Sequence, residues 1–249
     1  MCATCGCGNP EAPPATHEHE HSHGHEHDHT ETITLEQKIL AKNDELAEHN
    51  RAHLADRNIL AFNLTSSPGA GKTTLLERTI RDLDRPIAVI EGDQETLLDA
   101  NRITAAGANA VQINTGAGCH LDADMVHHAL HDLDPAPNSI LFIENVGNLV
   151  CPALFDLGEH CKVVIISVTE GTDKPLKYPH MFAAAGLVLI NKTDLLPYVD
   201  FDLDACSAYA RSVNPGVEII PLSATKGEGL QRWYDWIATR TSEVSATAR

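Results

Sequence analysis

Short apolar runs alternate with amphipathic stretches from about residue 59 to the C-terminus. Within each run the apolar residues are continuous rather than alternating, which indicates strands buried on both faces, as in a parallel sheet flanked by helices. The pattern therefore predicts one doubly wound α/β domain. We expect strands at Ile59–Leu64, Ile87–Ile90, Ala110–Ile113, Ile140–Ile143, Val163–Val168, Leu187–Ile190 and Val217–Ile220, and helices at Lys72–Leu83, Asp122–Leu133, Asp202–Val213 and Gly229–Thr239.

The segment before this domain has a different pattern. Residues 1–32 lack the apolar content needed to form a core and are expected to be a tail. From Ile33 to about Asp56 the apolar residues have helical spacing and predict a helix that packs on the domain. The apolar residues of this helix are Leu35, Ile39, Leu40 and Leu46. We therefore divide the chain into a tail, 1–32, and a domain with its N-terminal packing helix, 33–249.

Composition excludes several classes of function. The 249 residues carry a formal net charge of -17, which argues against a nucleic-acid partner. The sequence has no apolar stretch long enough to span a membrane, and its first residues do not resemble a signal peptide. We therefore expect a cytoplasmic protein. Three of the seven cysteines lie within the first seven residues, and in a reducing compartment such a cluster indicates metal ligands rather than disulfides.

A phosphate-binding loop follows the first predicted strand. The sequence S-S-P-G-A-G-K-T-T, residues 66–74, nearly matches G-x-x-x-x-G-K-[ST] and lies between a strand and a helix, as the motif requires. Glycines allow backbone N–H groups to surround phosphate oxygens at a helix N-terminus. Ser66 replaces the first glycine, which is tolerated if its φ is not positive. The predicted contacts are Gly69, Ala70, Gly71 and Thr74, with Lys72 on the β- and γ-phosphates and Thr73 on Mg²⁺.

Two later elements indicate that the nucleotide is GTP or GDP. Asn191-Lys192-Thr193-Asp194 follows a predicted strand and has the N-K-x-D pattern of GTPases. We expect the Asp194 carboxylate to accept hydrogen bonds from guanine, the Asn191 amide to meet the opposite edge of the base and Lys192 to cover its face. Ser223-Ala224-Thr225-Lys226 ends another strand and resembles the GTPase element whose backbone contacts guanine O6.

Acidic residues at two further strand ends are candidates for catalysis. Carboxylates at the carboxyl ends of strands lie near the ligand crevice in this fold. We expect Asp93 to hold Mg²⁺ directly or through water, and Glu144 to act as the Walker-B carboxylate. Gly147 is expected near the γ-phosphate, so that hydrolysis releases its loop. The sequence does not identify the group that activates water, although Asp99 is near enough to be considered.

The tail contains two kinds of candidate metal ligand. Cys2, Cys5 and Cys7 are close enough to hold one ion; a square-planar site with sulfur and nitrogen favours Ni²⁺, whereas tetrahedral sulfur favours Zn²⁺. Alternating histidines predict weak, exchangeable sites suited to storage. These histidines are His17, His19, His21, His23, His25, His27 and His29.

A second metal site is predicted inside the domain. Cys119 and His120 follow the third strand, and Cys151 lies just beyond the Glu144 loop. These loops are expected to meet on the nucleotide side of the sheet, where the three side chains suit Zn²⁺ or Ni²⁺ and leave a position open or supplied by a second chain. A buried pair of cysteines beside a hydrogen-bonded histidine is the structural alternative. Cys161 and Cys206 are interpreted as core residues.

Together these motifs resemble the hydrogenase nickel-incorporation GTPases of the HypB type over nearly the whole chain. The matching elements are C-x-x-C-G-C, the His-rich tail, the phosphate loop, E-G-D, T-G-x-G-C-H-L-D-A, E-N-V-G-N-L-V-C-P and N-K-T-D. The resemblance implies GTP-dependent insertion of nickel into the large-subunit precursor of [NiFe]-hydrogenase, a homodimer promoted by GTP or metal, and a HypA-type metallochaperone as partner. It also implies that Cys2, Cys5 and Cys7 form a high-affinity nickel site, and that Cys119, His120 and Cys151 form the metal site of the GTPase domain.

Three other functions remain as alternatives. A urease-type nickel GTPase shares the fold and often a His-rich N-terminus, but it is not expected to carry C-x-x-C-G-C. A nickel storage protein would have no need of intact Lys72, Thr73 and Asp194. A signalling GTPase would leave both Cys/His constellations unexplained.

Overall fold

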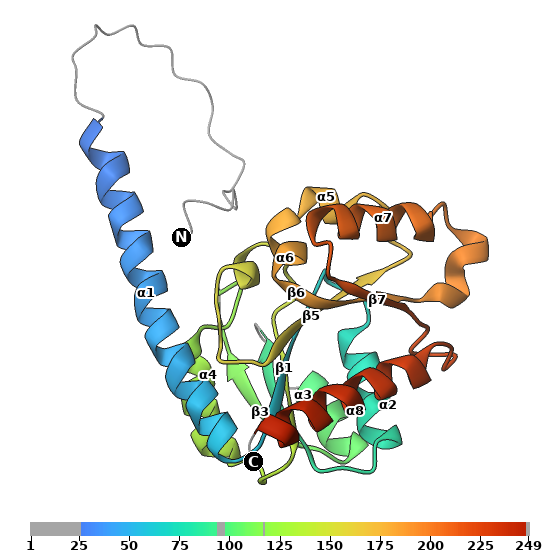
Figure 1. Ribbon diagram of the computed structural model, residues 1–249, viewed down its shortest axis with the longest axis horizontal. Coiled ribbons are helices and arrows are strands. Elements are labelled where there is room, and N and C mark those ends of the chain that lie inside the picture. Colours follow the sequence, from blue (N-terminus) through green and yellow to red (C-terminus); the bar gives the residue numbers. More distant parts are fainter. Residues whose placement is uncertain (1–25, 94–97, 117, 248–249) are drawn as a thin grey trace, which may run out of the picture.

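The computed structural model describes residues 26–93, 98–116 and 118–247, with side chains for 37–92, 99–116 and 118–243. Seven parallel strands form one sheet in the order β3-β2-β4-β1-β5-β6-β7, with helices on both faces (Figure 1). The strands are β1 Leu60–Ser66, β2 Ile87–Asp93, β3 Asn109–Asn114, β4 Ile140–Glu144, β5 Cys161–Ser167, β6 Ala185–Asn191 and β7 Glu218–Pro221. The predicted fold class and all seven predicted strands are confirmed.

The helices are α1 Glu26–Asp56, α2 Lys72–Asp82, α3 Leu98–Ala106, α4 Ala123–Leu133, α5 Lys174–Lys177, α6 Pro179–Ala184, α7 Leu203–Val213 and α8 Leu230–Thr247, with 3-10 turns η1 Cys151–Ala153 and η2 Thr193–Tyr198. The predicted starts of two helices agree with their caps. Asp122 accepts a hydrogen bond from Met125 N, and Asp202 accepts one from Ala205 N. These carboxylates satisfy backbone donors that have no partner within the first turn. Helices α3, α5 and α6 are short and were not predicted.

Alternate residues of the strands point to opposite faces and build a core on each. On one face Leu75 of α2 and Trp233 of α8 pack against Phe62 and Phe142 of the central strands. On the other face α1 and α4 cover β1, β2 and β4, while α6 and α7 cover β5, β6 and β7. Because the strands are parallel and buried on both faces, their carboxyl ends form one edge. The loops that leave this edge carry the candidate site.

Helix α1 begins at Glu26, so it extends into the segment 1–32 that the sequence predicted as tail. Its acidic first residues are compatible with a helix N-terminus, because the helix dipole favours negative charge there. The side of α1 that packs on the domain coincides only partly with the apolar side that the sequence predicted. Ile39 is 51% exposed, whereas Asn43 and Asn50 are buried. Helix α1 therefore packs on loop backbone through amide side chains as well as through apolar residues.

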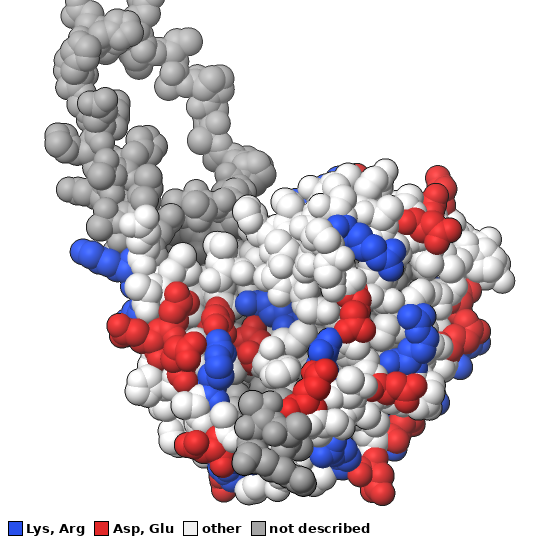
Figure 2. Space-filling view, viewed as in Figure 1, with Lys and Arg blue, Asp and Glu red and all other residues white. Residues whose placement is uncertain are grey.

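Charge is distributed without a broad basic region on the face drawn in Figure 2, where Lys and Arg side chains are interspersed with Asp and Glu. Within the described part of the chain, no helix has both the length and the apolar content needed to cross a bilayer.

Candidate functional site

The phosphate loop joins β1 to α2 at the middle of the sheet edge. Gly69 and Gly71 have φ values of 70° and 97°, a region that side chains other than glycine rarely adopt. A Cβ on Gly71 would lie 2.5 Å from Asn191 Nδ2, so this position has no room for a side chain. Ser66 is the last residue of β1 and does not have positive φ. The strand conformation thus explains why a serine is tolerated where the motif has its first glycine.

Three oxygen-bearing side chains meet at the start of α2. Thr73 Oγ1 lies 2.7 Å from Glu144 Oε1 and 3.2 Å from Asp99 Oδ2. The Lys72 ammonium lies 3.9 Å from Glu144 Oε1. Since the Thr73 hydroxyl has one hydrogen, it cannot donate to both carboxylates at once. Two carboxylates that share one hydroxyl beside a lysine form a site suited to a cation.

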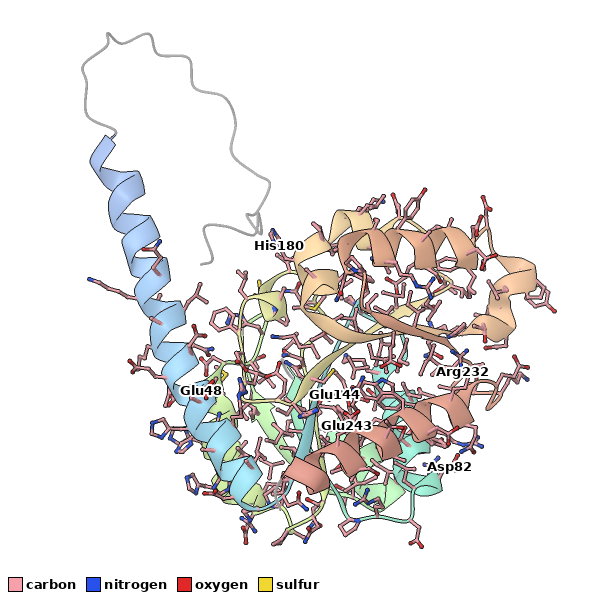
Figure 3. The ribbon with its side chains drawn as sticks, viewed as in Figure 1. Glu48, Asp82, Glu144, His180, Arg232 and Glu243 are labelled. Carbon is pink, nitrogen blue, oxygen red and sulfur yellow. The ribbon has the colours of Figure 1, made fainter. Side chains whose placement is uncertain are left out.

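Glu144 is buried at the end of β4, in the interior of the domain (Figure 3). Burial raises the pKa of its carboxyl, Lys72 and Thr73 oppose that rise, and the nearby charge of Asp99 adds to it. Its Oε2 atom has no hydrogen-bond partner among the described residues. Mg²⁺ prefers hard oxygen ligands and is usually held by one or two carboxylates together with phosphate and water. Glu144, Thr73 and Asp99 therefore fit a Mg²⁺ site. The sequence had placed Asp99 only as a possible water-activating group.

Asp93 is less well defined. It is the last residue of β2, at the same sheet edge as Glu144, but its side chain lies outside the described residues. Its contact with Mg²⁺ stays a prediction.

The candidate guanine-binding loops lie against the phosphate loop. Asn191 donates from Nδ2 to Ala70 O at 2.9 Å, and its Oδ1 accepts from Ala224 N at 3.1 Å and from Lys192 N at 2.8 Å. Because these contacts use most of its hydrogen-bonding capacity, Asn191 braces the three loops together. The contact of its amide with the base stays a prediction.

Asp194 and Ser223 connect the two elements predicted to contact guanine. Ser223 Oγ donates to Asp194 Oδ1 at 2.6 Å and accepts from Lys226 N at 3.1 Å. This arrangement holds the Asp194 carboxylate in one orientation and leaves its second oxygen for another donor. The side chain of Lys192 crosses to Gly69 O, with a distance of 2.7 Å from Nζ.

One cation near the phosphate loop was not predicted. Lys174, at the start of α5, donates from Nζ to Ser67 Oγ at 3.1 Å and pairs with Glu170 at 3.0 Å. No sequence motif marks this lysine, because its proximity depends on how the loop after β5 folds back over the phosphate loop. Its position makes it a candidate phosphate contact.

The predicted inner metal ligands come together, as their placement at the sheet edge indicated. The Sγ atoms of Cys119 and Cys151 lie 2.8 Å apart, and the Cys119 sulfur lies 3.6 Å from His120 Nδ1. All three candidate ligand atoms lie within 4.8 Å of one another. His120 stacks on Phe155 with ring centres 4.0 Å apart. Burial lowers the pKa of His120, and Asp122 partly opposes this effect. The lowered pKa favours the neutral imidazole, which is the form that metals bind.

A single loop connects this cluster to the phosphate site. It begins beside Glu144 and ends at Cys151. A Cβ on Gly147 would lie 3.2 Å from Pro68 Cα, so this backbone lies against the phosphate loop. Asn145 Oδ1 accepts from Leu121 N at 3.2 Å, and Asn148 Nδ2 donates to Cys119 O at 3.2 Å. The same loop thus contacts the phosphate loop and the segment that carries Cys119 and His120.

The other cysteines that the structure describes are unsuited to metal binding. Cys206 is buried, and burial raises the pKa of its thiol to about 12. Burial likewise raises the pKa of Cys161 to about 11. Both thiols therefore stay protonated at neutral pH, in agreement with their prediction as core residues. The tail ligands Cys2, Cys5, Cys7 and the five histidines from His17 to His25 lie outside the described residues, as do the side chains of His27 and His29.

Comparisons with known proteins agree with this geometry. Residues 60–221 match the family model described as "CobW/HypB/UreG, nucleotide-binding domain". This range extends from β1 to β7 and includes the phosphate loop, the Cys/His cluster and the N-K-x-D element.

Comparisons with individual proteins identify a narrower group within this family. The chain is 63% identical over 207 residues to "Hydrogenase maturation factor HypB" of Azotobacter vinelandii, covering 82% of this chain and 68% of the relative. It is similar to the crystal structure of HypB from Archaeoglobus fulgidus, with a TM-score of 0.76, 40% identity and coverage of 81% and 99% of the two chains. HypB from Helicobacter pylori, solved in complex with nickel, gives a TM-score of 0.77, 36% identity and coverage of 81% and 96%. The chain belongs to the HypB group of hydrogenase maturation factors, within the CobW/HypB/UreG family of nucleotide-binding proteins.

Proposed function

We propose that this chain is a GTP-hydrolysing nickel metallochaperone that inserts nickel into the large-subunit precursor of [NiFe]-hydrogenase. The observation that carries the proposal is the loop from Glu144 to Cys151. It contacts the phosphate loop at Pro68 and the segment bearing the Cys/His cluster at Cys119. A nucleotide site and a metal site that share one loop suit a protein whose metal affinity depends on GTP.

The first half of the mechanism is recognition of the nucleotide. The Asp194 carboxylate accepts from the guanine N1–H and exocyclic amine, because the hydrogen bond from Ser223 leaves acceptor sites on both of its oxygens. The glycines of the phosphate loop present backbone N–H groups to the phosphates, and Lys72 neutralises the charge between the β- and γ-phosphates. When bound, Mg²⁺ supplies further charge neutralisation, and Thr73, Glu144 and Asp99 are the residues that would hold it.

The second half is transmission to the metal. With GTP bound, the γ-phosphate adds a partner for the backbone near Gly147, and loss of that phosphate removes it. Movement of this loop displaces both Cys151, which the loop carries, and Cys119, which Asn148 holds. Because ligand spacing determines metal affinity, separation of the two sulfurs favours release of nickel.

The inner cluster supplies three ligands and leaves at least one position open. An open position permits ligand exchange with a donor or an acceptor protein. Val150 and Leu154, on either side of Cys151, are 49% and 57% exposed. Exposed apolar residues at a metal site suit a surface that is covered by another chain. We infer that this surface takes part in a homodimer promoted by GTP or metal, which brings two inner sites together.

The tail supplies the remaining parts of the proposed pathway. Cys2, Cys5 and Cys7 form the tight nickel site, and the alternating histidines buffer the ion before delivery. A HypA-type metallochaperone is the partner that exchanges nickel with this chain. Zn²⁺ is the other ion that the inner site accepts, because thiolate and imidazole ligands suit both metals.

The test is transfer of nickel in a purified system. The reduced full-length chain, loaded with Ni²⁺, is mixed with a HypA-type metallochaperone and the hydrogenase large-subunit precursor, with GTP or with a non-hydrolysable analogue. Nickel in the precursor is measured after separation. We expect transfer with GTP and little transfer with the analogue or with Lys72→Ala. Equal transfer in all three reactions would indicate a nickel storage protein whose GTPase has no part in delivery.

A further inference from the structure

Helices α1 and α4 lie side by side on one face of the sheet (Figure 1), and each carries a pair of histidines four residues apart. His49 and His53 belong to α1, while His127 and His131 belong to α4. Residues at positions i and i+4 of a helix lie on the same side of it, and two histidines with this spacing are a known arrangement for binding one metal ion. Glu48, labelled in Figure 3, marks the turn of α1 where this first pair begins.

The imidazole rings of the two helices approach each other. The ring centres of His127 and His131 are 4.7 Å apart with planes at 84°, and those of His53 and His131 are 6.1 Å apart. With metal–nitrogen bonds of about 2.0–2.1 Å, two imidazoles on one ion have ring centres roughly 4.5–5.2 Å apart for bond angles between about 90° and 109°. The α4 pair already has this spacing. The ring centres of His53 and His131 lie about 1 Å outside this range, and no three of the described histidines have ligand atoms within 4.8 Å of one another. A shared ion therefore requires rotation of the His131 side chain, which is exposed.

The protonated nitrogen of His127 can be assigned from its neighbours. Asn50 is fully buried in α1, and its Nδ2 donates to Ala123 O at 2.8 Å and to Leu157 O at 3.1 Å. The other atom of this amide, Oδ1, therefore has to be an acceptor, and it lies 3.1 Å from His127 Nδ1. His127 consequently carries its hydrogen on Nδ1 and presents the lone pair of Nε2. A ring N–H that donates to a fixed oxygen is the usual support behind a metal-binding histidine.

The electrostatic surroundings of His127 favour its neutral form. Burial is the largest cause that lowers the pKa of His127. The neighbouring His131, His128 and His49 lower this pKa further, and Asp124 partly opposes them. Neutral imidazole is also the form that binds metal.

We propose that His127 and His131 of α4, together with His53 of α1, form a binding site for a divalent transition-metal ion, separate from the tail ligands and from the Cys119, His120 and Cys151 cluster. Imidazole nitrogens suit Ni²⁺, Cu²⁺ and Zn²⁺. An ion at this site links α1 to α4, and thereby links the helix that follows the tail to the helix that follows the inner cluster. The site does not depend on whether the chain hydrolyses GTP or delivers nickel.

The test is carbethoxylation of histidines by diethyl pyrocarbonate, measured residue by residue by mass spectrometry. The reduced full-length chain is modified without metal, with Ni²⁺ alone and with Zn²⁺ alone. At a metal concentration about ten times the dissociation constant, modification of a ligand slows roughly tenfold, because about nine-tenths of the sites are filled. We expect slowing of this size at His127, His131 and His53. His180 is exposed and outside the cluster, and it is expected to react at the same rate in every sample.

Two variants show whether the histidines share one ion. In His131→Gln, protection of His127 and His53 is expected to disappear, although neither residue has been changed. His128→Gln is the matched control. His128 is also exposed on α4, but its Nδ1 lies 2.8 Å from Asp124 O, and it lies outside the two i, i+4 pairs. Protection is expected to persist in this variant. If His127 and His131 react equally fast with and without both metals, or if His131→Gln leaves His127 protected, these histidines do not share one ion.

Discussion

The side-chain amide of Asn148 donates a hydrogen bond to the backbone carbonyl of Cys119 at 3.2 Å. Asn148 is one residue beyond Gly147, whose backbone lies against the phosphate loop, and three residues before the metal-ligand candidate Cys151. This contact joins the two segments that carry the inner cluster. It is therefore the place where a change at the phosphates is expected to alter both sulfurs together.

Replacing Asn148 by alanine is expected to weaken the coupling between nucleotide and metal. Allosteric coupling between two sites typically corresponds to about 1–3 kcal/mol, or roughly 5–150-fold in affinity. We expect the ratio of inner-site nickel affinities in the GDP and GTP-analogue states to move toward one, while the rate of GTP hydrolysis is retained. Asn109→Ala is a control, because Asn109 is exposed at the amino end of β3, at the edge of the sheet opposite the candidate site. An unchanged ratio in Asn148→Ala would show that the coupling follows another route.

Lys72→Ala is expected to abolish GTP hydrolysis. In the proposed site Lys72 neutralises the β- and γ-phosphates, and removal of one such stabilising group typically lowers the rate about 10²–10³-fold. Metal binding by the tail is expected to survive, since it uses separate residues. Release of phosphate and equilibrium binding of Ni²⁺ measure the two properties. Lys177→Ala, which removes an exposed lysine paired with Asp173, is the matched control. Unchanged turnover in Lys72→Ala would contradict the proposed phosphate site.

Asp194→Asn is expected to change the base that the protein prefers. In the proposed site the carboxylate accepts from the two donors of guanine, whereas an amide can donate to the oxygen that xanthine has in place of the amine. If the binding free energy of GTP weakens by about 1.4 kcal/mol and that of xanthosine triphosphate strengthens by about the same amount, each affinity changes tenfold. Competition between the two nucleotides should show this shift clearly. Ser223 can still donate to the remaining oxygen of the side chain, which preserves the loop. If GTP remained preferred to the same extent, the assignment of guanine to this loop would be wrong.

Glu144→Gln is expected to stabilise the nucleotide-free protein. Because burial raises the pKa of Glu144 in the folded state, the unfolded chain loses this proton first as pH rises. Stability therefore falls between the unfolded and folded pKa values, and above them the folded protein carries an unfavourable buried charge. We expect a higher Tm for the variant at pH 7 than for the parent, and a smaller difference at pH 4.

Mg²⁺ and GDP together provide the contrast in the same experiment. Ligands that bind the folded state raise its Tm, and the increase is expected to be smaller in Glu144→Gln because one proposed Mg²⁺ ligand is lost. Glu159→Gln is a second comparison, since Glu159 is buried and its carboxylate lies 3.2 Å from the Lys162 ammonium, closer than the 3.9 Å between Glu144 and Lys72. Its loss leaves a buried ammonium and should lower Tm. A fall in Tm for Glu144→Gln would show that its charge is compensated in the free protein.

The fold was predictable because every strand from β1 to β7 contains a short apolar run, and amphipathic spacing marks the longer helices α2, α4, α7 and α8. The short helices α3, α5 and α6 carry no such pattern. The site was predictable to the extent that motifs follow strand ends, since parallel topology brings those ends to one edge. Contacts between loops were not predictable in this way. Lys174 reaches Ser67 only after the loop beyond β5 folds back, and Asp99 reaches Thr73 only after α3 packs on α2.

The packing of α1 shows a second limit of sequence patterns. Its apolar spacing placed Ile39 on the packing face, but Ile39 is exposed and Asn43 and Asn50 are buried. Asn43 donates to Asp156 O at 2.8 Å and accepts from Ala123 N at 2.9 Å. These side-chain amides form hydrogen bonds with loop backbone groups, which a leucine side chain cannot do. Because the buried residues here are polar, the packing side of α1 has no apolar periodicity that sequence analysis could detect.

The most direct test of coupling between GTP and nickel is a titration of the inner site in two nucleotide states. In the full-length chain with Cys2, Cys5 and Cys7 replaced by serine, sulfur-to-nickel charge-transfer absorbance arises from Cys119 and Cys151, because burial keeps the Cys161 and Cys206 thiols protonated. The reduced protein is titrated with Ni²⁺ in the presence of GDP and of a non-hydrolysable GTP analogue. We expect an absorbance band in this protein that is lost when Cys119 and Cys151 are also replaced, with affinities that differ at least about fivefold between the nucleotides. Equal affinities in the two states would contradict a nickel site controlled by GTP.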